Sequence, residues 1–397
     1  MARILIDGSM ARGGGGLTYL VNVVPRLLRL APDDRFLLVV RNERIASALA
    51  AAPNLAIERL PPAGPVRRLG FALSQGARLA ARWQADLYFS SGETVPLFVR
   101  CPRIASFRNA NALLPLAGEY SGLERLRMLG LRAQVGIAAR LCDRILFVSR
   151  DSARWMGDAL CLPPERRVVV HHGVDVERWR AGASRGRLHP RPYVLSVSSI
   201  YRYKNFVRLI EAWTTLARRH SDRALPDLVI IGDDQDPPYR RRMESARAAA
   251  GELASRIHLV GEVPYDDIAA WYAGAELFVF ASYLETFGHP LLEAMAAGIP
   301  LVAADLPVAR EIAGEAALFA DPFRVEGLAD AMERGLFRRD TREELVARGA
   351  ERVRSFTWER AAESLLALFA EVLADPQRVR PRELPAETVV RAPGSGS

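Results

Sequence analysis

The 397-residue sequence has few of the features that mark disulfide-rich, zinc-binding or membrane-spanning proteins. Its three cysteines, Cys101, Cys142 and Cys161, are too few and too scattered for a disulfide framework or a zinc cluster, which is typical of a reducing compartment. The longest apolar stretch, residues 268–284, is interrupted by Glu276 and is shorter than the roughly 20 apolar residues that a spanning helix needs. The first apolar run stops at an aspartate, which predicts a strand and not a signal peptide. We therefore expect a folded protein without a membrane-spanning segment.

Lysine is nearly absent, because Lys204 is the single lysine among the 54 basic residues. In a chain that otherwise uses arginine, this position is expected to need a compact ammonium group. The charge is uneven: residues 1–188 hold 28 arginines against 15 acidic residues, and the remainder is slightly acidic. A basic half favours an anionic partner such as nucleic acid, an acidic polymer or a membrane surface, but a general preference for arginine explains it equally well. No module typical of nucleic-acid binding is present, so no nucleic-acid partner is expected.

The length and the alternation of short apolar runs with amphipathic segments predict an α/β fold with two Rossmann-like units. Strands are expected at residues 4–6, 36–40, 55–60, 87–89, 104–107, 145–148, 168–170, 194–197, 228–231, 257–260, 277–280 and 301–303. Residues 180–192 have the composition of a linker and indicate a boundary near residue 188. The segment from residue 376 onward, rich in proline and ending in Gly-Ser-Gly-Ser, predicts a frayed tail.

Four consecutive glycines, residues 13–16, lie between the first expected strand and a helix expected at residues 17–30. Glycine permits positive φ angles and the close approach of a ligand, and the start of the helix offers free amides to an anion. The run suits a phosphate or a sugar, but it matches neither the G-x-G-x-x-G pattern nor a P-loop. A simple flexible turn explains it as well.

A second candidate site follows the strand expected at residues 277–280. The strand ends in a loop that carries Glu285 and Gly288, and Pro290 then occupies a favoured first position of a helix that ends at Gly298. Ligands of open α/β sheets bind at this carboxyl edge. The backbone amides expected to face a negatively charged group are those of Phe287, Gly288 and His289.

Two further side chains are expected at the same edge. Lys204 lies in a strand-to-helix crossing, where its cation suits the charge that builds on a departing diphosphate. Glu293, in the first helical turns, suits hydrogen bonds from hydroxyl groups such as those of a ribose. Taken alone, each of these residues is also explained as a solvated surface residue.

The block from residue 256 to residue 321 resembles the largest family of retaining glycosyltransferases with the GT-B fold, the glycosyl transferases group 1. The resemblance rests on Gly261, Glu285 and Glu293 with seven residues between them, Ala294-Met295-Ala296-Ala297-Gly298, Pro300, Asp305, Glu311, Lys204-Asn205, the glycine run, residues 147–152 and His172-Gly173-Val174-Asp175. It implies two Rossmann-like domains whose parallel sheets face a central cleft. The implied parts are an acceptor-side domain at residues 1–188, a donor-side domain at 189–355, a helix at 356–375 that returns to the first domain, and a flexible tail at 376–397.

The resemblance also implies roles for individual residues. The lysine at the place of Lys204 contacts the donor's diphosphate, the first glutamate (Glu285) lies near the transferred sugar, and the second (Glu293) binds the ribose of the nucleotide. The loop that closes over the donor from the opposite domain corresponds to Gly14, Gly15 and Gly16, and the amides that hold sugar and phosphate correspond to Thr286, Phe287, Gly288 and His289. The implied reaction moves a sugar from a GDP- or UDP-linked donor to a hydroxyl of a glycan or lipid-linked acceptor, with retention and with no metal or other cofactor.

The sequence departs from the family pattern at two places. Many relatives have an arginine five residues before the lysine, where this chain has Ser199, and Arg202 is expected to help stabilise the leaving diphosphate instead. Many also have a His-Asp pair after the strand expected at residues 104–107, where this chain has Arg108 and Asn109. An asparagine can hydrogen-bond to the donor sugar but cannot act as a base near neutral pH. The acidic run at residues 233–236 is expected to be a solvated loop and not a metal site.

Residues 123–132 mix arginines with large apolar side chains. This pattern suits peripheral contact with an anionic membrane, where a lipid-linked acceptor is found, but core packing with a solvated arginine face explains it equally well. The expected process is the assembly of cell-envelope polysaccharide such as lipopolysaccharide, in the cytoplasm or at the inner face of the plasma membrane. Two alternatives are a catalytically inactive sugar-nucleotide-binding protein and an NAD-dependent Rossmann oxidoreductase, against which the missing G-x-G-x-x-G counts.

Overall fold

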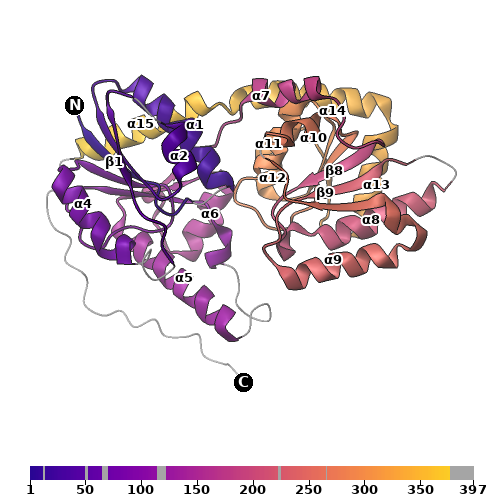
Figure 1. The fold of residues 1–397 in the computed structure, drawn as a ribbon, viewed down its shortest axis with the longest axis horizontal. Helices are drawn as coiled ribbons and strands as arrows, with labels where there is room; N and C mark the ends of the chain where they lie inside the picture. Colours follow the sequence, from indigo (N-terminus) through magenta and orange to yellow (C-terminus); the bar gives the residue numbers. More distant parts are fainter. Residues whose placement is uncertain are drawn as a thin grey trace.

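A computed structural model describes residues 1–11, 14–49, 52–64, 70–113, 122–221, 225–264 and 266–375. It contains two parallel sheets that lie side by side, each with helices on both faces (Figure 1). The α/β architecture with two Rossmann-like units is therefore confirmed. Gly13 and the expected tail from residue 376 onward lie outside the described residues.

The first sheet, which defines the N-terminal domain, has the strand order β3-β2-β1-β4-β5-β6-β7. Its strands are β1 (Arg3–Asp7), β2 (Arg35–Val40), β3 (Leu55–Arg59), β4 (Leu87–Ser90), β5 (Arg103–Phe107), β6 (Arg144–Phe147) and β7 (Arg167–Val169). The inner strands are almost continuous apolar runs because helices bury both faces of the sheet.

The second sheet, which defines the C-terminal domain, has the order β10-β9-β8-β11-β12-β13. Its strands are β8 (Tyr193–Val197), β9 (Asp227–Ile231), β10 (Ile257–Gly261), β11 (Leu277–Phe280), β12 (Leu301–Ala304) and β13 (Leu318–Ala320). All strands expected from the sequence are present, and β13 was missed. Its three residues, Leu-Phe-Ala, are too short a run to stand out in an apolar region.

Helices connect the strands in the order that a parallel sheet requires. Those before β8 are α1 (Gly14–Leu30), α2 (Glu43–Ala48), α4 (Gly76–Trp83), α5 (Gly122–Leu141), α6 (Arg150–Ala159) and α7 (Val176–Ala181), with η1 (Phe71–Gln75), η2 (Ala110–Leu113), η3 (Pro164–Arg166) and η4 (Gly182–Arg185). Those after β8 are α8 (Phe206–Arg219), α9 (Pro237–Ala249), α10 (Ile268–Ala273), α11 (His289–Ala297), α12 (Pro307–Ala313), α13 (Val325–Phe337), α14 (Arg339–Arg352) and α15 (Trp358–Ala374), with η5 (Arg202–Lys204), η6 (Gly251–Arg256) and η7 (Val353–Ser355). Within the described ranges, no helix has the length and apolarity to cross a bilayer.

The last helix, α15, leaves the C-terminal domain and packs on the N-terminal domain (Figure 1). Leu365 and Phe369 join the core formed by β1 and α1, and the Phe369 ring lies 5.4 Å from that of Phe89 in β4. Two ion pairs hold the helix from outside, Arg26–Glu359 at 2.7 Å and Arg144–Glu371 at 2.6 Å. The return helix begins beside the segment that leads into α7, where the Val174 amide donates to the Phe356 carbonyl at 3.0 Å, and it ties the two domains together.

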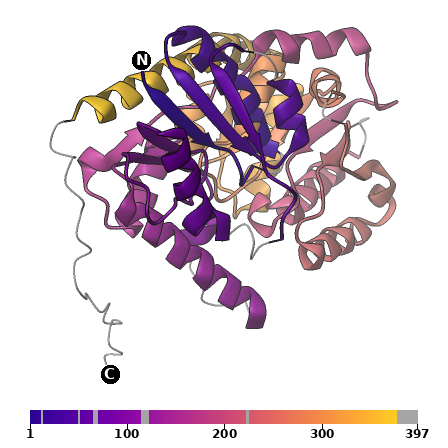
Figure 2. The ribbon, with the colours of Figure 1, turned by 60° about the vertical axis from the view of Figure 1, so that its left-hand side comes forward.

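The chain passes from one core to the other ahead of residue 188. Trp179 of α7 is buried against α10 of the C-terminal domain, with its ring 4.9 Å from that of Tyr272. Helix α5 projects from the body of the N-terminal domain in both views (Figures 1 and 2).

Candidate active site

Lys204 and Glu285 meet at the carboxyl edge of the second sheet. Lys204 ends η5, in the crossing after β8, and Glu285 lies in the loop after β11. Because β8 and β11 are neighbours in the sheet, these two crossings are adjacent. The Lys204 Nζ atom lies 2.5 Å from Oε1 of Glu285, and both side chains are 12% exposed.

The turn that presents Lys204 is fixed by the next residue. Asn205 has a left-handed backbone with φ 64°, which asparagine tolerates better than most residues. Its buried side-chain amide donates to the carbonyl oxygens of Ala281 and Pro322, at 3.1 and 2.7 Å. Asn205 thereby ties the loop after β8 to the loops after β11 and β13 and holds the lysine in place.

The residues after Glu285 form the start of α11. Gly288 is the N-cap, with φ +85°, a conformation that strains any residue with a Cβ. Pro290 occupies the first helical turn and Gly298 ends the helix, as the sequence predicts. Pro290 has no amide hydrogen and the Leu291 amide donates to the carbonyl of Gly288, so the donors that the start of α11 offers next to the Lys204–Glu285 pair are the amides of Gly288 and His289.

Glu293 lies in the second turn of α11 and is half-buried. Burial raises its pKa to about 7, against smaller opposing contributions from the hydrogen bond of Tyr272 and the charge of Arg178. The Tyr272 hydroxyl donates to Oε2 of Glu293 at 2.8 Å. The carboxylate is therefore oriented by one donor and titrates near neutral pH, where small changes in its surroundings alter its charge.

Thr286 connects this edge to the N-terminal domain. Its hydroxyl donates to the backbone carbonyl of Arg108 at 2.7 Å, and its own carbonyl accepts from the hydroxyl of Ser149 at 2.7 Å. Ser149 is fully buried and is also the N-cap of α6. The two carboxyl edges are thus in direct contact around the residue that follows Glu285.

The glycine run begins α1 on the opposite side. Gly14 has φ +52°, and a Cβ added to Gly14 or Gly15 would have no described atom within 4 Å. These two glycines are therefore not required for packing, and a Cβ on Gly16 would lie 3.3 Å from Ala11 Cβ. The open space at the start of α1 agrees with a loop that a ligand approaches closely.

Three other residues expected at the site have different surroundings. Arg202 points to Asp236, with Nε 3.0 Å from its Oδ2, so an acidic partner already compensates its charge. Asp236 is buried and caps α9, which corrects the expectation that the whole acidic run is solvated. Asn109 is exposed, with its backbone amide 2.8 Å from Glu93, and Ser199 lies half-buried between β8 and η5.

A pair of histidines across the interface was missed by the sequence reasoning. His172 Nδ1 lies 2.6 Å from Nε2 of His289, the first residue of α11, and the rings stack at 4.7 Å. Burial lowers the pKa of both imidazoles, that of His289 to about 4, and the charge of Arg108 lowers them further. The motif at residues 172–175 marked the segment, but nothing in the spacing indicates the partner.

Glu311 of α12 also bridges the domains. Its carboxylate accepts from the amides of Arg150 and Asp151 at the start of α6, at 2.8 and 3.0 Å, and lies 2.7 Å from His171 Nε2. Burial opposes ionisation, but these hydrogen bonds outweigh it and hold the pKa of Glu311 below its ordinary value. A carboxylate of one domain therefore caps a helix of the other.

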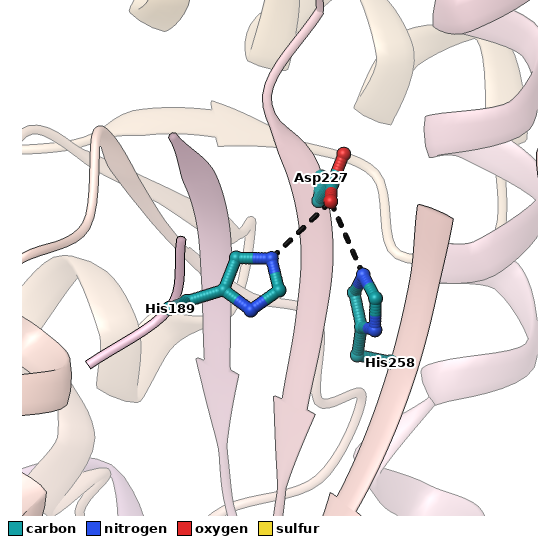
Figure 3. Close-up of side chains that lie close together, drawn as sticks. All are labelled: His189, Asp227 and His258. Atoms are coloured by element: carbon teal, nitrogen blue, oxygen red, sulfur yellow. Dashed lines mark hydrogen bonds and ion pairs between the residues drawn. The ribbon is translucent and has the colours of Figure 1, made fainter. Parts of the chain in front are cut away.

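A cluster of possible metal ligands lies elsewhere, at the amino ends of β8, β9 and β10 (Figure 3). Nε2 of His189 and Nε2 of His258 each lie 3.2 Å from Oδ2 of the buried Asp227. The other oxygen of Asp227 pairs with Arg256 at 3.0 Å and Arg191 at 3.4 Å. Since two guanidinium groups already neutralise the carboxylate, a divalent cation would add to an excess of positive charge, and the donor set does not fit one.

Two protein-family models match the chain: Glycosyltransferase Family 4 at residues 13–178 and Glycosyl transferases group 1 at residues 178–352. Similar proteins include O-antigen chain mannosyltransferase B of Escherichia coli, 38% identical over 42% of this chain and 42% of that protein. Another is D-inositol 3-phosphate glycosyltransferase of Salinispora tropica, 31% identical over 71% of this chain and 60% of that protein. The chain thus matches less than two thirds of the length of these relatives.

Solved structures share the fold at low sequence identity. Sucrose-phosphate synthase from Thermosynechococcus elongatus has a TM-score of 0.73 and 18% identity, covering 94% of this chain and all of that one. Anabaena HepE in complex with UDP-glucose has a TM-score of 0.70 and 17% identity, with the same coverage of 94% of this chain. At such identities the likeness concerns the fold.

Proposed function

The chain belongs to the glycosyl transferases group 1 family and has the GT-B fold, and we propose that it is an enzyme that transfers a sugar from a nucleotide-sugar donor to a hydroxyl group of an acceptor. The observation that carries this proposal is the Lys204–Glu285 ion pair at the start of α11. Withdrawing two charges from water is costly, so such a pair at a sheet's carboxyl edge favours a ligand-binding role.

The donor's diphosphate binds between Lys204 and the first-turn amides of α11. The bond from the anomeric carbon to the diphosphate oxygen breaks, and its electron pair leaves with the diphosphate. The acceptor's hydroxyl oxygen bonds to the anomeric carbon on the face that the diphosphate leaves, so the configuration is retained. The proton of that hydroxyl passes to the departing phosphate oxygen. The ammonium and the helix amides stabilise the charge that develops, so the step requires no metal.

Glu285 lies beside the transferred sugar and keeps Lys204 oriented toward the phosphate. Glu293 accepts hydrogen bonds from the ribose hydroxyls, for which its ionised form is the stronger acceptor. The contacts of Thr286 with Arg108 and Ser149 support a closed cleft that excludes water, which limits hydrolysis of the donor. Among the remaining site residues, Gly14 to Gly16 approach the donor from α1, and Asn109 and Ser199 hydrogen-bond at its periphery. Arg202, which pairs with Asp236 in this structure, is proposed to turn toward the diphosphate when the donor binds.

The donor is a GDP- or UDP-linked sugar. Support comes from the names of similar proteins, a mannosyltransferase and a protein solved with UDP-glucose. The acceptor is a glycan or lipid-linked glycan of the cell envelope, for which the O-antigen enzyme among the relatives gives support. GDP-mannose is the first donor to test.

The acceptor is reached at the inner face of the plasma membrane through α5. This helix exposes Leu126 and Leu129, 69% and 46% accessible, beside the exposed Arg125, Arg127 and Arg132. Apolar side chains flanked by arginines suit the interface of an anionic leaflet. In a flotation assay, the protein is expected to float with vesicles of phosphatidylglycerol and not with vesicles of phosphatidylcholine. A Leu126→Gln, Leu129→Gln variant is expected to lose the interaction, whereas binding unaffected by both substitutions would contradict it.

The transferase proposal is tested in two steps. Thermal shifts with GDP-mannose, UDP-glucose, UDP-N-acetylglucosamine and NAD identify the ligand class, and the best donor is then incubated with envelope glycolipids while nucleotide diphosphate release is measured in the presence of a chelator. Release with the chelator present, and a product whose anomeric configuration matches that of the donor by NMR, are expected. Binding without turnover would favour an inactive sugar-nucleotide-binding protein, and stabilisation by NAD alone would favour an oxidoreductase.

A further inference from the structure

Among the buried side-chain polar atoms that have no hydrogen-bond partner in the described part of the chain, three lie together at the domain interface: Tyr19 Oη, Arg108 Nη1 and His172 Nε2. Tyr19 is 1% and His172 is 4% exposed. Buried polar groups are nearly always paired, because an unpaired one loses its hydration without compensation. Three unpaired atoms in one place therefore indicate groups that a bound molecule satisfies.

The three side chains come from separate elements and contact each other. Tyr19 lies in the second turn of α1, Arg108 follows β5 and His172 follows β7. The Arg108 guanidinium carbon lies 4.8 Å from the centre of the Tyr19 ring, and the Tyr19 and His172 ring centres are 5.1 Å apart. Nη2 of Arg108 donates to the carbonyl of Ser91, which orients the guanidinium and leaves Nη1 as the unpaired end.

This cluster borders the start of α11. His172 contacts His289, and the Arg108 carbonyl accepts from Thr286, the residue after Glu285. Since burial and the neighbouring charge of Arg108 lower the pKa of His289 to about 4, both imidazoles are uncharged near neutral pH. The guanidinium of Arg108 is then the charged member of the cluster, at the position where the proposed function places the reacting sugars.

We propose that Arg108, Tyr19 and His172 bind an oxyanion, a carboxylate or phosphate group, carried by one of the two sugar substrates. The proposal rests on the proposed function, because that function brings both sugars to this edge. Glu93 faces Arg108 from the backbone side, where its Oε1 accepts from the Arg108 and Asn109 amides and partly balances the guanidinium charge. An oxyanion at the unpaired Nη1 adds a charge-assisted hydrogen bond there and accepts from the Tyr19 hydroxyl and from His172 Nε2–H, whereas a neutral hydroxyl makes only the weaker neutral hydrogen bonds. The Nε2–H tautomer of His172 leaves Nδ1 to accept from His289 Nε2–H. Because the three atoms are buried in this structure, the group is expected to enter when the two domains separate.

The two possible sources of the oxyanion are separated by two assay arms. In the donor arm, calorimetry compares UDP-glucuronic acid with UDP-glucose and GDP-mannuronic acid with GDP-mannose. In the acceptor arm, nucleotide diphosphate release compares mannose 6-phosphate, fructose 6-phosphate and inositol 1-phosphate with the unphosphorylated parents. A preference of at least tenfold for the charged partner is expected in one arm, in Kd or in kcat/KM. Equal use of charged and neutral partners in both arms would overturn the inference.

Arg108→Gln is expected to reduce that preference to near unity, and Tyr19→Phe, which keeps the ring, to lower it several-fold. Arg140→Gln is the matched control, because Arg140 is exposed on α5 and its guanidinium contacts a carbonyl of its own helix. A preference that survives Arg108→Gln would refute the assignment, and if that variant does not fold, an unchanged preference in Tyr19→Phe would do so. Either of these two results would refute the oxyanion site without contradicting the proposed transferase activity. Failure of the wild-type protein to bind any nucleotide would end both.

Discussion

Replacing Lys204 by methionine removes the ammonium and keeps an apolar stem of similar length. Because Nζ lies 2.5 Å from Glu285 and both side chains are 12% exposed, the substitution leaves a buried carboxylate without its partner. This is expected to lower the free energy of unfolding by about 3–5 kcal/mol. A charge-assisted hydrogen bond to a diphosphate contributes roughly 1.5–3 kcal/mol, so the Kd for GDP or UDP is expected to rise about 10- to 150-fold.

A double variant separates these two effects. Lys204→Met with Glu285→Gln contains no uncompensated charge, so it is expected to recover most of the lost stability but not the nucleotide affinity. Urea unfolding measures the stability and titration calorimetry measures the affinity. Arg219→Met is the matched control, because Arg219 pairs with Asp330 at the same distance of 2.5 Å but is 37% exposed. It is expected to cost less than about 1 kcal/mol and to leave nucleotide binding unchanged.

The reasoning fails if the Lys204→Met protein binds both nucleotides within twofold of the wild type. It also fails if the double variant recovers affinity together with stability, because the lysine would then act only by compensating Glu285. Either result would place the diphosphate elsewhere and remove the main support for the proposed reaction.

Three shorter predictions follow from other carboxylates. The pKa of Glu293 is raised to about 7, so the nucleotide affinity of the wild type is expected to increase as the pH rises through 7, whereas that of Glu293→Gln is expected not to change with pH. Folding disfavours the ionised form of Glu293, so at pH 8 the variant is expected to be about 1–3 kcal/mol more stable than the wild type in urea unfolding. Burial opposes ionisation of Asp227, but hydrogen bonds from His189, Arg256 and His258 lower its pKa overall. The free energy of unfolding of Asp227→Asn is expected to be about 3–5 kcal/mol lower than that of the wild type at pH 7. This difference is expected to shrink as the pH falls below 3.8, the ordinary pKa of the group, and through the lowered pKa. Glu311→Gln is expected to lower stability by about 1–3 kcal/mol in calorimetric unfolding at pH 7, and an unchanged Tm would show that the cap on α6 contributes nothing.

Local patterns were sufficient for the elements that carry the site. Runs of apolar residues placed twelve strands, and the sequence from Gly288 through Pro290 to Gly298 placed the start and end of α11. These features are encoded by neighbouring residues, because a positive φ needs glycine and the first helical turn tolerates proline. The return of α15 to the N-terminal domain came from family resemblance, and the amphipathic sequence of the helix is compatible with more than one surface.

By itself, the sequence determined which residues end strands and begin helices, and therefore that Lys204 and Glu285 share one sheet edge. Only the tertiary structure decided which side chains meet across the cleft. Arg202 pairs with Asp236, and Arg108 contacts Tyr19 and borders His172, and neither contact follows from the local pattern. The physical reason is that periodicity reports the burial of one face of one element, whereas a contact between charged or polar side chains depends on the docking of elements distant in the chain.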